Sequence, residues 1–135
     1  MKDFRKLMVW EKSHALAIEV YRATAGFPRG EVFGLTAQIR RACVSIPSNL
    51  AEGCGRRSDA ELGRFGVIAM GSASECEYQL LLARDLKYLD GPQAEALSGR
   101  VVEVKRMLAG LLSRLGGAGR RPSSTPPLAE QRAES

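Results

Sequence analysis

The sequence predicts an all-α protein built from four helices that pack into one bundle. Four segments carry apolar residues at intervals of three and four, which is the spacing of one helix face. Glycine and proline interrupt this pattern, and the stretch Ser58-Asp59-Ala60-Glu61 has the form of a capping box, which marks a helix start. With 135 residues and 44% hydrophobic residues, the chain is one domain that can bury a core without disulfide or metal staples.

The first helix is predicted over residues 9–25. Its apolar positions are separated by charged residues, as expected for an amphipathic helix with one buried face. The segment Phe27-Pro28-Arg29-Gly30 then ends it, because proline and glycine do not continue a helical pattern. The apolar positions are Val9, Trp10, Leu16, Ala17, Val20 and Tyr21.

The second helix is predicted to begin at residue 33 or 34 and to end between residues 51 and 54, with Pro47 in its interior. An interior proline removes one backbone hydrogen bond, clashes with the carbonyl of Cys43 and costs about 3 kcal/mol. We favour a helix that continues through a kink at Pro47; the alternative is a helix that ends at Ile46 and is followed by a loop. Three short polar side chains beside the break are able to bond the freed carbonyl groups: Ser45, Ser48 and Asn49.

A polar stripe accompanies the apolar stripe of this helix. At roughly 100° per residue its members share one side of the helix. Two interpretations stay open, a solvated face or a polar seam against a neighbouring helix or subunit. The stripe consists of Gln38, Arg41, Ser45, Asn49 and Glu52.

The third helix is predicted from the cap at Ser58 as far as Leu89, about 30 residues and roughly 45 Å. Its middle is rich in small residues, which let another helix approach closely; Gly71 is a candidate for such a crossing. Its later apolar residues point in nearly every direction around the axis, so we expect most sides to be covered, in part by self-association. These are Tyr78, Leu80, Leu81, Leu82, Leu86 and Leu89.

The fourth helix is predicted to begin at Pro92, a residue that suits the first helical position, and to end before Gly116-Gly117. Apolar residues recur at three- and four-residue intervals from Leu97 to Leu115. We therefore place the four-helix domain at residues 1–115. Residues 116–135 are rich in Pro, Ser, Gly and Arg without an apolar period, and we expect a flexible, disordered tail.

Composition narrows the function classes. The formal net charge of +5 permits contact with a polyanion without requiring it. Cys43, Cys54 and Cys76 have no Cys-x-x-Cys spacing and fit neither a disulfide framework nor a zinc site. The start of the chain has no signal-like apolar run and no stretch approaches a membrane span, so a cytoplasmic protein with no membrane partner is expected.

No catalytic grouping emerges from the sequence, and we expect neither enzyme activity nor a cofactor or metal. His14 is the only histidine and has no nucleophile pattern around it. The glycines of 63–71 follow no strand and do not resemble a phosphate loop. The carboxylates Glu52, Glu75, Glu77 and Asp85 lack the Glu-x-x-His motif of bundle metal sites, so ion pairing with Arg40, Arg41 or Arg84 is the better interpretation.

One set of residues forms a recognisable pattern: Trp10, Tyr21, Thr24, Phe27-Pro28, Gly34-Leu35-Thr36, Gln38, Arg41-Ala42, Ser45-Ile46-Pro47, Asn49, Ala51-Glu52-Gly53, Gly71-Ser72, Glu75 and Glu77. This pattern, and above all the string Ser-Ile-Pro-x-Asn-x-Ala-Glu-Gly, resembles the four-helix bundle family of 23S rRNA intervening-sequence proteins. The resemblance covers roughly residues 4–115. It implies an up-and-down bundle that assembles into a homopentameric ring, without enzyme activity. Its implied structural or interface motif is Gln38, Arg41, Ser45, Pro47, Asn49, Glu52, Gly53, Gly71, Ser72, Glu75 and Glu77.

The same resemblance extends to the accessory variability determinant protein of diversity-generating retroelements, which binds nucleic acid and a reverse transcriptase. Function transfers less reliably than fold. Our leading hypothesis is an oligomeric scaffold that binds structured RNA or DNA through phosphate contacts. The alternative is a protein-interaction adaptor without a nucleic-acid role; an enzyme comes a distant third. The candidate phosphate contacts are Arg40, Arg41, Arg56, Arg57 and Arg64, with Lys2, Arg5 and Lys6 at the N-terminus.

Overall fold

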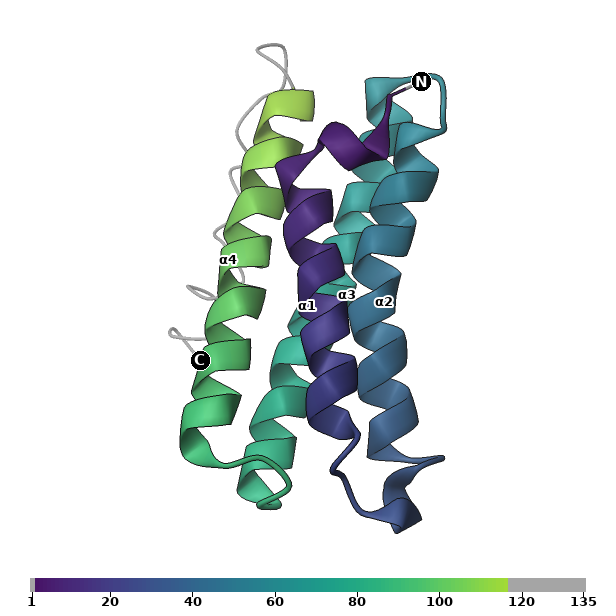
Figure 1. Ribbon diagram of the computed structural model, residues 1–135. Coiled ribbons are helices and arrows are strands. Elements are labelled where there is room, and N and C mark those ends of the chain that lie inside the picture. The colour runs from purple at the N-terminus through teal and green to yellow at the C-terminus, as the bar shows by residue number, and fades with distance from the viewer. Residues whose placement is uncertain (1, 117–135) are drawn as a thin grey trace, which may run out of the picture.

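The computed structural model describes residues 2–116, which contain four α-helices and no strand (Figure 1). Consecutive helices run in opposite directions, so the bundle is of the up-and-down type. The tail predicted for 116–135 lies outside the described residues except for its first residue, which ends the last helix. The elements are η1 (Phe4–Lys6), α1 (Met8–Thr24), η2 (Arg29–Glu31), α2 (Leu35–Cys54), α3 (Asp59–Asp85) and α4 (Gly91–Gly116), where η denotes a short 3₁₀-helix.

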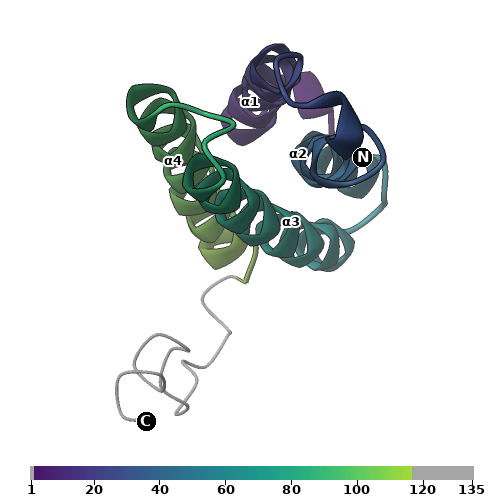
Figure 2. The same cartoon turned by 90° about the horizontal axis from the view of Figure 1, so that it is seen from below.

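Each helix packs against two neighbours, as the view along the bundle shows (Figure 2). α2 lies between α1 and α3, and α4 closes the bundle between α3 and α1. The apolar stripes predicted from the sequence meet along the axis and form one core. Its largest fully buried side chains include Leu16, Val20, Ile39, Ile46, Leu50, Leu80, Val101, Val104 and Leu108. Within residues 2–116 no helix is both long and apolar enough to cross a membrane.

α2 continues through Pro47 for seven further residues, so the alternative of a helix that ends at Ile46 is wrong. Pro47 is buried. The Asn49 side-chain amide donates to the backbone carbonyl of Ser45 at 2.8 Å and to its hydroxyl at 2.9 Å. A polar side chain therefore binds a backbone carbonyl beside the break, as expected. The kink itself stays a prediction.

α3 begins where the sequence predicts and ends earlier. The Ser58 hydroxyl accepts a hydrogen bond from the Glu61 backbone N–H at 3.1 Å, which confirms the cap. The predicted extension to Leu89 is wrong, because the helix ends at Asp85 and Lys87 adopts a left-handed conformation with φ of 65°. The N–H of Tyr88 then bonds the carbonyl of Ala83 at 2.9 Å, and that of Lys87 bonds the carbonyl of Arg84 at 2.9 Å. This pair of bonds is a Schellman motif, which closes a helix C-terminus.

Close helix packing occurs at two glycines, and Gly71 is not one of them. A Cβ atom on Gly53 would lie 2.8 Å from Leu62 Cδ1, and one on Gly66 would lie 2.9 Å from Leu112 Cδ2. The space beside Gly71 is open. Gly53 therefore sets the approach of α2 to α3, and Gly66 sets the approach of α3 to α4.

The bundle leaves one face of α3 uncovered. The expectation that this helix is covered on most sides is not met within the chain, since large apolar side chains remain exposed along it. They are Val67, Ile68, Tyr78 and Leu81, with Leu86 at the C-cap that follows the helix.

Candidate nucleic-acid interface

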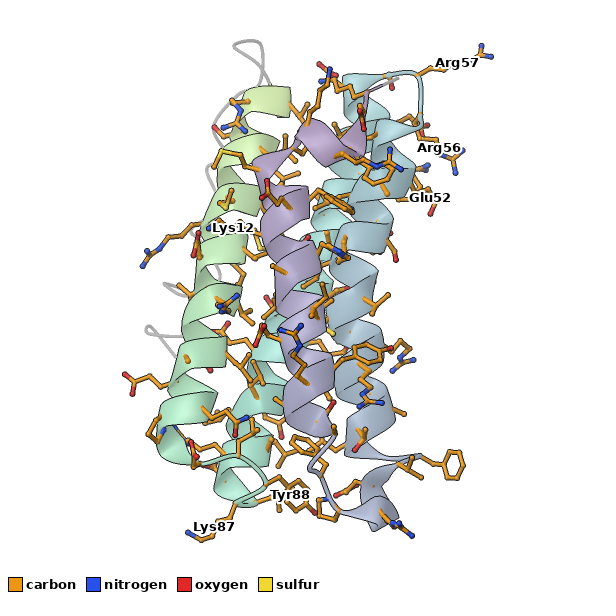
Figure 3. The ribbon with its side chains drawn as sticks, viewed as in Figure 1. Lys12, Glu52, Arg56, Arg57, Lys87 and Tyr88 are labelled. Carbon is orange, nitrogen blue, oxygen red and sulfur yellow. The ribbon has the colours of Figure 1, made fainter. Side chains whose placement is uncertain are left out.

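Three of the predicted arginines lie together where α2 passes into α3. α2 ends at Cys54 and the Ser58 cap starts α3, so the short turn between them carries Arg56 and Arg57, and Arg64 follows on the second turn of α3. Figure 3 shows Arg57 extending from this end of the bundle, with Arg56 beside it and Glu52 below on α2. Arg56 and Arg57 are adjacent in the sequence, and Arg64 lies less than two helical turns from the start of α3. The three side chains therefore form a compact cationic group.

Arg56 and Arg64 are held in place by similar contacts. Their guanidinium carbons lie 5.2 and 5.5 Å from the centre of the Phe65 ring. Arg56 also pairs with Glu52 at 3.0 Å, and Arg64 pairs with Glu61 at 3.2 Å. Both pairs are exposed, so water screens them and each contributes little to stability. Breaking either pair therefore costs little.

Arg57 differs from these two because it is exposed and forms no salt bridge within residues 2–116. The N-terminal segment joins the same end of the bundle. The backbone N–H of Lys2 donates to the carbonyl of Cys54 at 2.8 Å, and its ammonium group pairs with Asp59 at 3.1 Å. Arg5 follows in η1 and contacts Asp3 at 3.7 Å. Lys2 therefore lies next to the α2–α3 turn, and η1 with Arg5 follows it at the same end of the bundle.

Arg40 does not belong to this group; it is half-buried and links α2 to the end of α1. Its Nε donates to the Thr24 hydroxyl at 2.8 Å, a terminal nitrogen donates to the Tyr21 carbonyl at 3.2 Å, and its guanidinium lies 4.5 Å from the Tyr21 ring centre. A cation at the last turn of α1 is stabilised by the helix dipole. Arg41 is exposed on α2 and bonds Gln38 on the same helix at 3.3 Å. About 22 Å of helix separates these residues from Arg56.

The polar stripe of α2 is a seam at its centre and a solvated face at its ends. Half-buried Ser45 lies 2.8 Å from Ser72 of α3, hydroxyl oxygen to hydroxyl oxygen. Gln38 and Arg41 are exposed and bond each other on α2, and exposed Glu52 bonds Arg56 in the turn that follows the helix. Both interpretations of the stripe therefore apply, each to a different part.

Two of the four carboxylates singled out from the sequence form ion pairs with residues other than the predicted arginines. Glu52 pairs with Arg56, and Glu77 pairs with Lys105 of α4 at 2.9 Å. Only Asp85 pairs with one of the expected arginines, Arg84, at 3.1 Å. Glu75 is exposed and forms no salt bridge in the described part of the chain. Across residues 2–116 no group of three His, Cys, Asp or Glu side chains could hold a metal ion.

The three thiols are buried in the bundle. Burial raises the pKa of Cys43 to about 12 and that of Cys76 to about 12, and it also raises the pKa of Cys54. A thiol with a raised pKa is a poor nucleophile, because the thiolate is the reactive form. They therefore act as small core residues.

An apolar groove between α1 and α2 was missed by the sequence reasoning. It has a volume of about 560 Å³ and is lined by Trp10, whose ring stacks on His14 with centroids 5.0 Å apart. Ile18 and Tyr21 continue the wall along α1, and Val44 faces them from α2. The available signal was the i, i+4 spacing of Trp10, His14 and Ile18, which places them on one face.

Comparison with known proteins agrees with this architecture. The family described as 23S rRNA-intervening sequence protein matches residues 5–110. The chain belongs to that family. The match to the 23S rRNA-intervening sequence protein family spans α1, α2 and α3 entirely and α4 as far as Gly110, and it confirms the resemblance drawn from the Ser-Ile-Pro-x-Asn-x-Ala-Glu-Gly string.

A crystal structure of similar fold is described as a protein with unknown function from the S23 ribosomal protein family of Bacteroides thetaiotaomicron. It is 26% identical, with a TM-score of 0.70, and the alignment covers 78% of this chain and 98% of that chain. No curated protein matches the chain. The comparisons therefore establish the family and its helical fold.

Proposed function

We propose that this member of the 23S rRNA-intervening sequence protein family is a non-enzymatic, homo-oligomeric scaffold that binds structured nucleic acid at one end of its bundle. The supporting observation is the charge of that end, formed by residues 2–6 and 55–64 and called the basic end below. It carries six cations against three anions. The opposite end, residues 25–35 and 84–95, carries three cations against four anions.

Phosphate contacts suit the chemistry of the basic end. Arginine guanidinium groups present several donors in a planar fork that matches phosphate oxygens. Phe65, which lies under Arg56 and Arg64, is buried and offers no open face to a base. Binding here would therefore read the backbone, tolerate many sequences and weaken steeply with salt.

The test is fluorescence anisotropy with a labelled, structured fragment of ribosomal RNA between about 50 and about 200 mM salt. Wild type should bind at low salt and release as salt rises. Replacing Arg56, Arg57 and Arg64 with Gln should lower the affinity and reduce the salt slope by about 3, one for each lost contact. The matched control replaces Arg29, Arg84 and Arg100, which carry the same total charge elsewhere. Absence of binding by wild type at low salt would overturn the proposal.

Self-association is the second part of this proposal. It is supported by the uncovered face of α3 and by Phe33, which is 94% exposed before α2. Large apolar side chains exposed together on one helix face are typical of interaction sites. A homopentamer, as the family resemblance implies, would have five times the monomer mass of 14.7 kDa.

Light scattering measures this mass directly. A Val67→Glu/Leu81→Glu variant should lower the mass at micromolar concentration, because it places charge on the face of α3. Ile18→Glu, on the α1–α2 groove, is the control for a different apolar surface. A monomer mass for wild type would contradict self-association.

A protein-interaction adaptor is the alternative, and the α1–α2 groove favours it. Its lining is almost entirely apolar, which suits a helix or loop of a protein partner better than a charged ligand. Such an adaptor should recover its partner from a nuclease-treated host lysate, and Ile18→Glu should abolish the recovery. Recovery that depends on intact nucleic acid would favour the scaffold instead.

A further inference from the structure

A second cationic surface lies in a cleft between the start of α1 and the second half of α4. The cleft has a volume of about 530 Å³. Its charged lining residues are all cations and none is a carboxylate: Lys6, Arg106 and Arg114. Its other lining residues are Leu7, Met8, Val9, Met107, Gly110 and Leu111, which give an apolar floor.

One of the two arginines lies over a glycine of the same helix. Arg106, Gly110 and Arg114 are spaced four residues apart on α4, so they share one face, with about 6 Å of helix between neighbours. The Arg114 guanidinium folds back over the middle residue, where its nearer nitrogen would lie 3.5 Å from a Cβ atom. The Arg114 guanidinium therefore lies beside Gly110, back along the helix in the direction of the turn that carries Arg106.

These charges are not neutralised within the described chain. Lys6, Arg106 and Arg114 form no salt bridge in residues 2–116, whereas nearby Glu103 is already paired with Lys12 at 3.4 Å. All three cations are exposed, so water screens their mutual repulsion, and no carboxylate in the cleft competes with an incoming anion. An anion that enters the cleft therefore meets charge of one sign only, which favours the binding of negative groups.

We propose that this cleft binds phosphate groups of the same nucleic acid that contacts the basic end. The inference rests on the proposed function and extends it to a second face. η1 connects the two surfaces, because it carries Lys6 to the cleft while Lys2 is bound at the α2–α3 turn. Figure 1 shows η1 crossing the end of the bundle between α2 and the start of α1, at the end where α4 finishes.

A polynucleotide fits this arrangement better than an isolated anion does. Its charges repeat along a strand, so one molecule can occupy the cleft and the turn together. Each additional phosphate contact releases counterions and steepens the salt dependence of binding. If phosphates bind in the cleft, the affinity of wild type should fall more steeply with salt concentration than contacts to Arg56, Arg57 and Arg64 alone would cause.

The experiment compares wild type, Arg106→Gln/Arg114→Gln and the control Arg29→Gln/Arg100→Gln, which removes the same charge away from the cleft. The probe is a fluorescein-labelled RNA hairpin, measured by anisotropy across a salt series. The cleft variant should lose about tenfold in affinity at low salt and reduce the slope by about 2, while the control changes neither. Arg106→Lys/Arg114→Lys should restore most of the slope, because it keeps the charge.

The possible negative results distinguish a failure of the cleft inference from a failure of the proposed function. If the cleft variant binds like the control while the Arg56, Arg57 and Arg64 variant is weakened, the cleft inference fails and the proposed function stands. If wild type binds no RNA at low salt, the proposed function fails and the cleft inference with it. If the cleft variant loses binding only to vesicles of phosphatidylserine and phosphatidylcholine, the cleft is a lipid site. Lys6→Gln gives an independent reading should the double variant unfold, with an expected slope change of about 1.

Discussion

The hydroxyl oxygens of Ser45 and Ser72 lie 2.8 Å apart and join α2 to α3 directly beside the interior proline. Asn49 donates to the same Ser45 side chain at 2.9 Å, so one small network connects the interrupted helix to its neighbour. Hydrogen bonds in a partly buried place are stronger than in water, and a partner left unpaired there is destabilising. The network therefore fixes how α2 and α3 are aligned along their axes.

Ser45→Ala and Ser72→Ala should each lower the free energy of unfolding by about 1 kcal/mol. The loss of stability in the double variant should be smaller than the sum of the two single losses, by at least about 0.5 kcal/mol. The reason is that both substitutions remove the same hydrogen bond. Urea denaturation measures these values. Ser48→Ala is the control, because Ser48 is exposed and the substitution changes helix propensity by the same amount as Ser45→Ala does. Strict additivity would show that the two hydroxyls do not interact.

Gly53→Ala and Gly71→Ala should have opposite effects on stability. A methyl group on Gly53 would lie 2.8 Å from Leu62 Cδ1 and 3.0 Å from Phe65 Cβ, and such overpacking costs about 1–3 kcal/mol. The same group on Gly71 meets open space and should stabilise the helix by about 0.5–1 kcal/mol. Thermal unfolding gives both values. A loss of stability at Gly71 would indicate that another copy covers this position.

Lys87→Gly should stabilise the protein by up to about 1 kcal/mol, because Lys87 adopts a φ of 65° that disfavours any side chain. The Schellman hydrogen bonds that follow α3 use only backbone atoms and should survive the change. Denaturant unfolding measures the effect. Arg100→Gly, at an exposed position in the interior of α4, is the contrasting control and should destabilise. A stability unchanged or lowered by Lys87→Gly would contradict strain at this position.

Stability at alkaline pH should depend on Tyr88. Its hydroxyl donates to the Glu31 carboxylate at 2.8 Å, and this bond raises the pKa of Tyr88 above its ordinary value of about 10. The folded state therefore holds this proton more tightly than the unfolded state. The resulting stabilisation is fully present below about pH 10 and is lost as the pH rises through the raised pKa.

The measurement compares unfolding free energies of wild type and Tyr88→Phe from about pH 8 to about pH 11. The stability difference between them should shrink above about pH 10, since wild type then loses the hydrogen bond that the variant never has. The buried cysteines titrate equally in both proteins and cancel in the comparison. A difference that stays constant over this range would mean that the Tyr88–Glu31 bond does not favour the protonated phenol.

Part of the candidate interface follows from the sequence. Arg56, Arg57 and Arg64 cluster because they flank one short turn, so their proximity is a local property. Arg40 has the same charge and an equally polar sequence context, yet it is held by Thr24 and the Tyr21 carbonyl of another helix. Its hydrogen-bond partner Thr24 lies 16 residues away in the sequence, so no local sequence pattern predicts this contact.

The sequence alone determined the four helices, the Ser58 cap, the shared core stripe and the family, because periodicity, capping chemistry and a motif string depend on residues close together along the chain. The tertiary structure decided which charges remain unpaired and where they gather. Lys6 and Arg114 lie near opposite ends of the described chain and line one cleft only because an up-and-down bundle brings the start of α1 beside the end of α4. Electrostatic attraction depends on distance in space, so it is fixed by how the helices pack and not by the spacing of residues in the sequence.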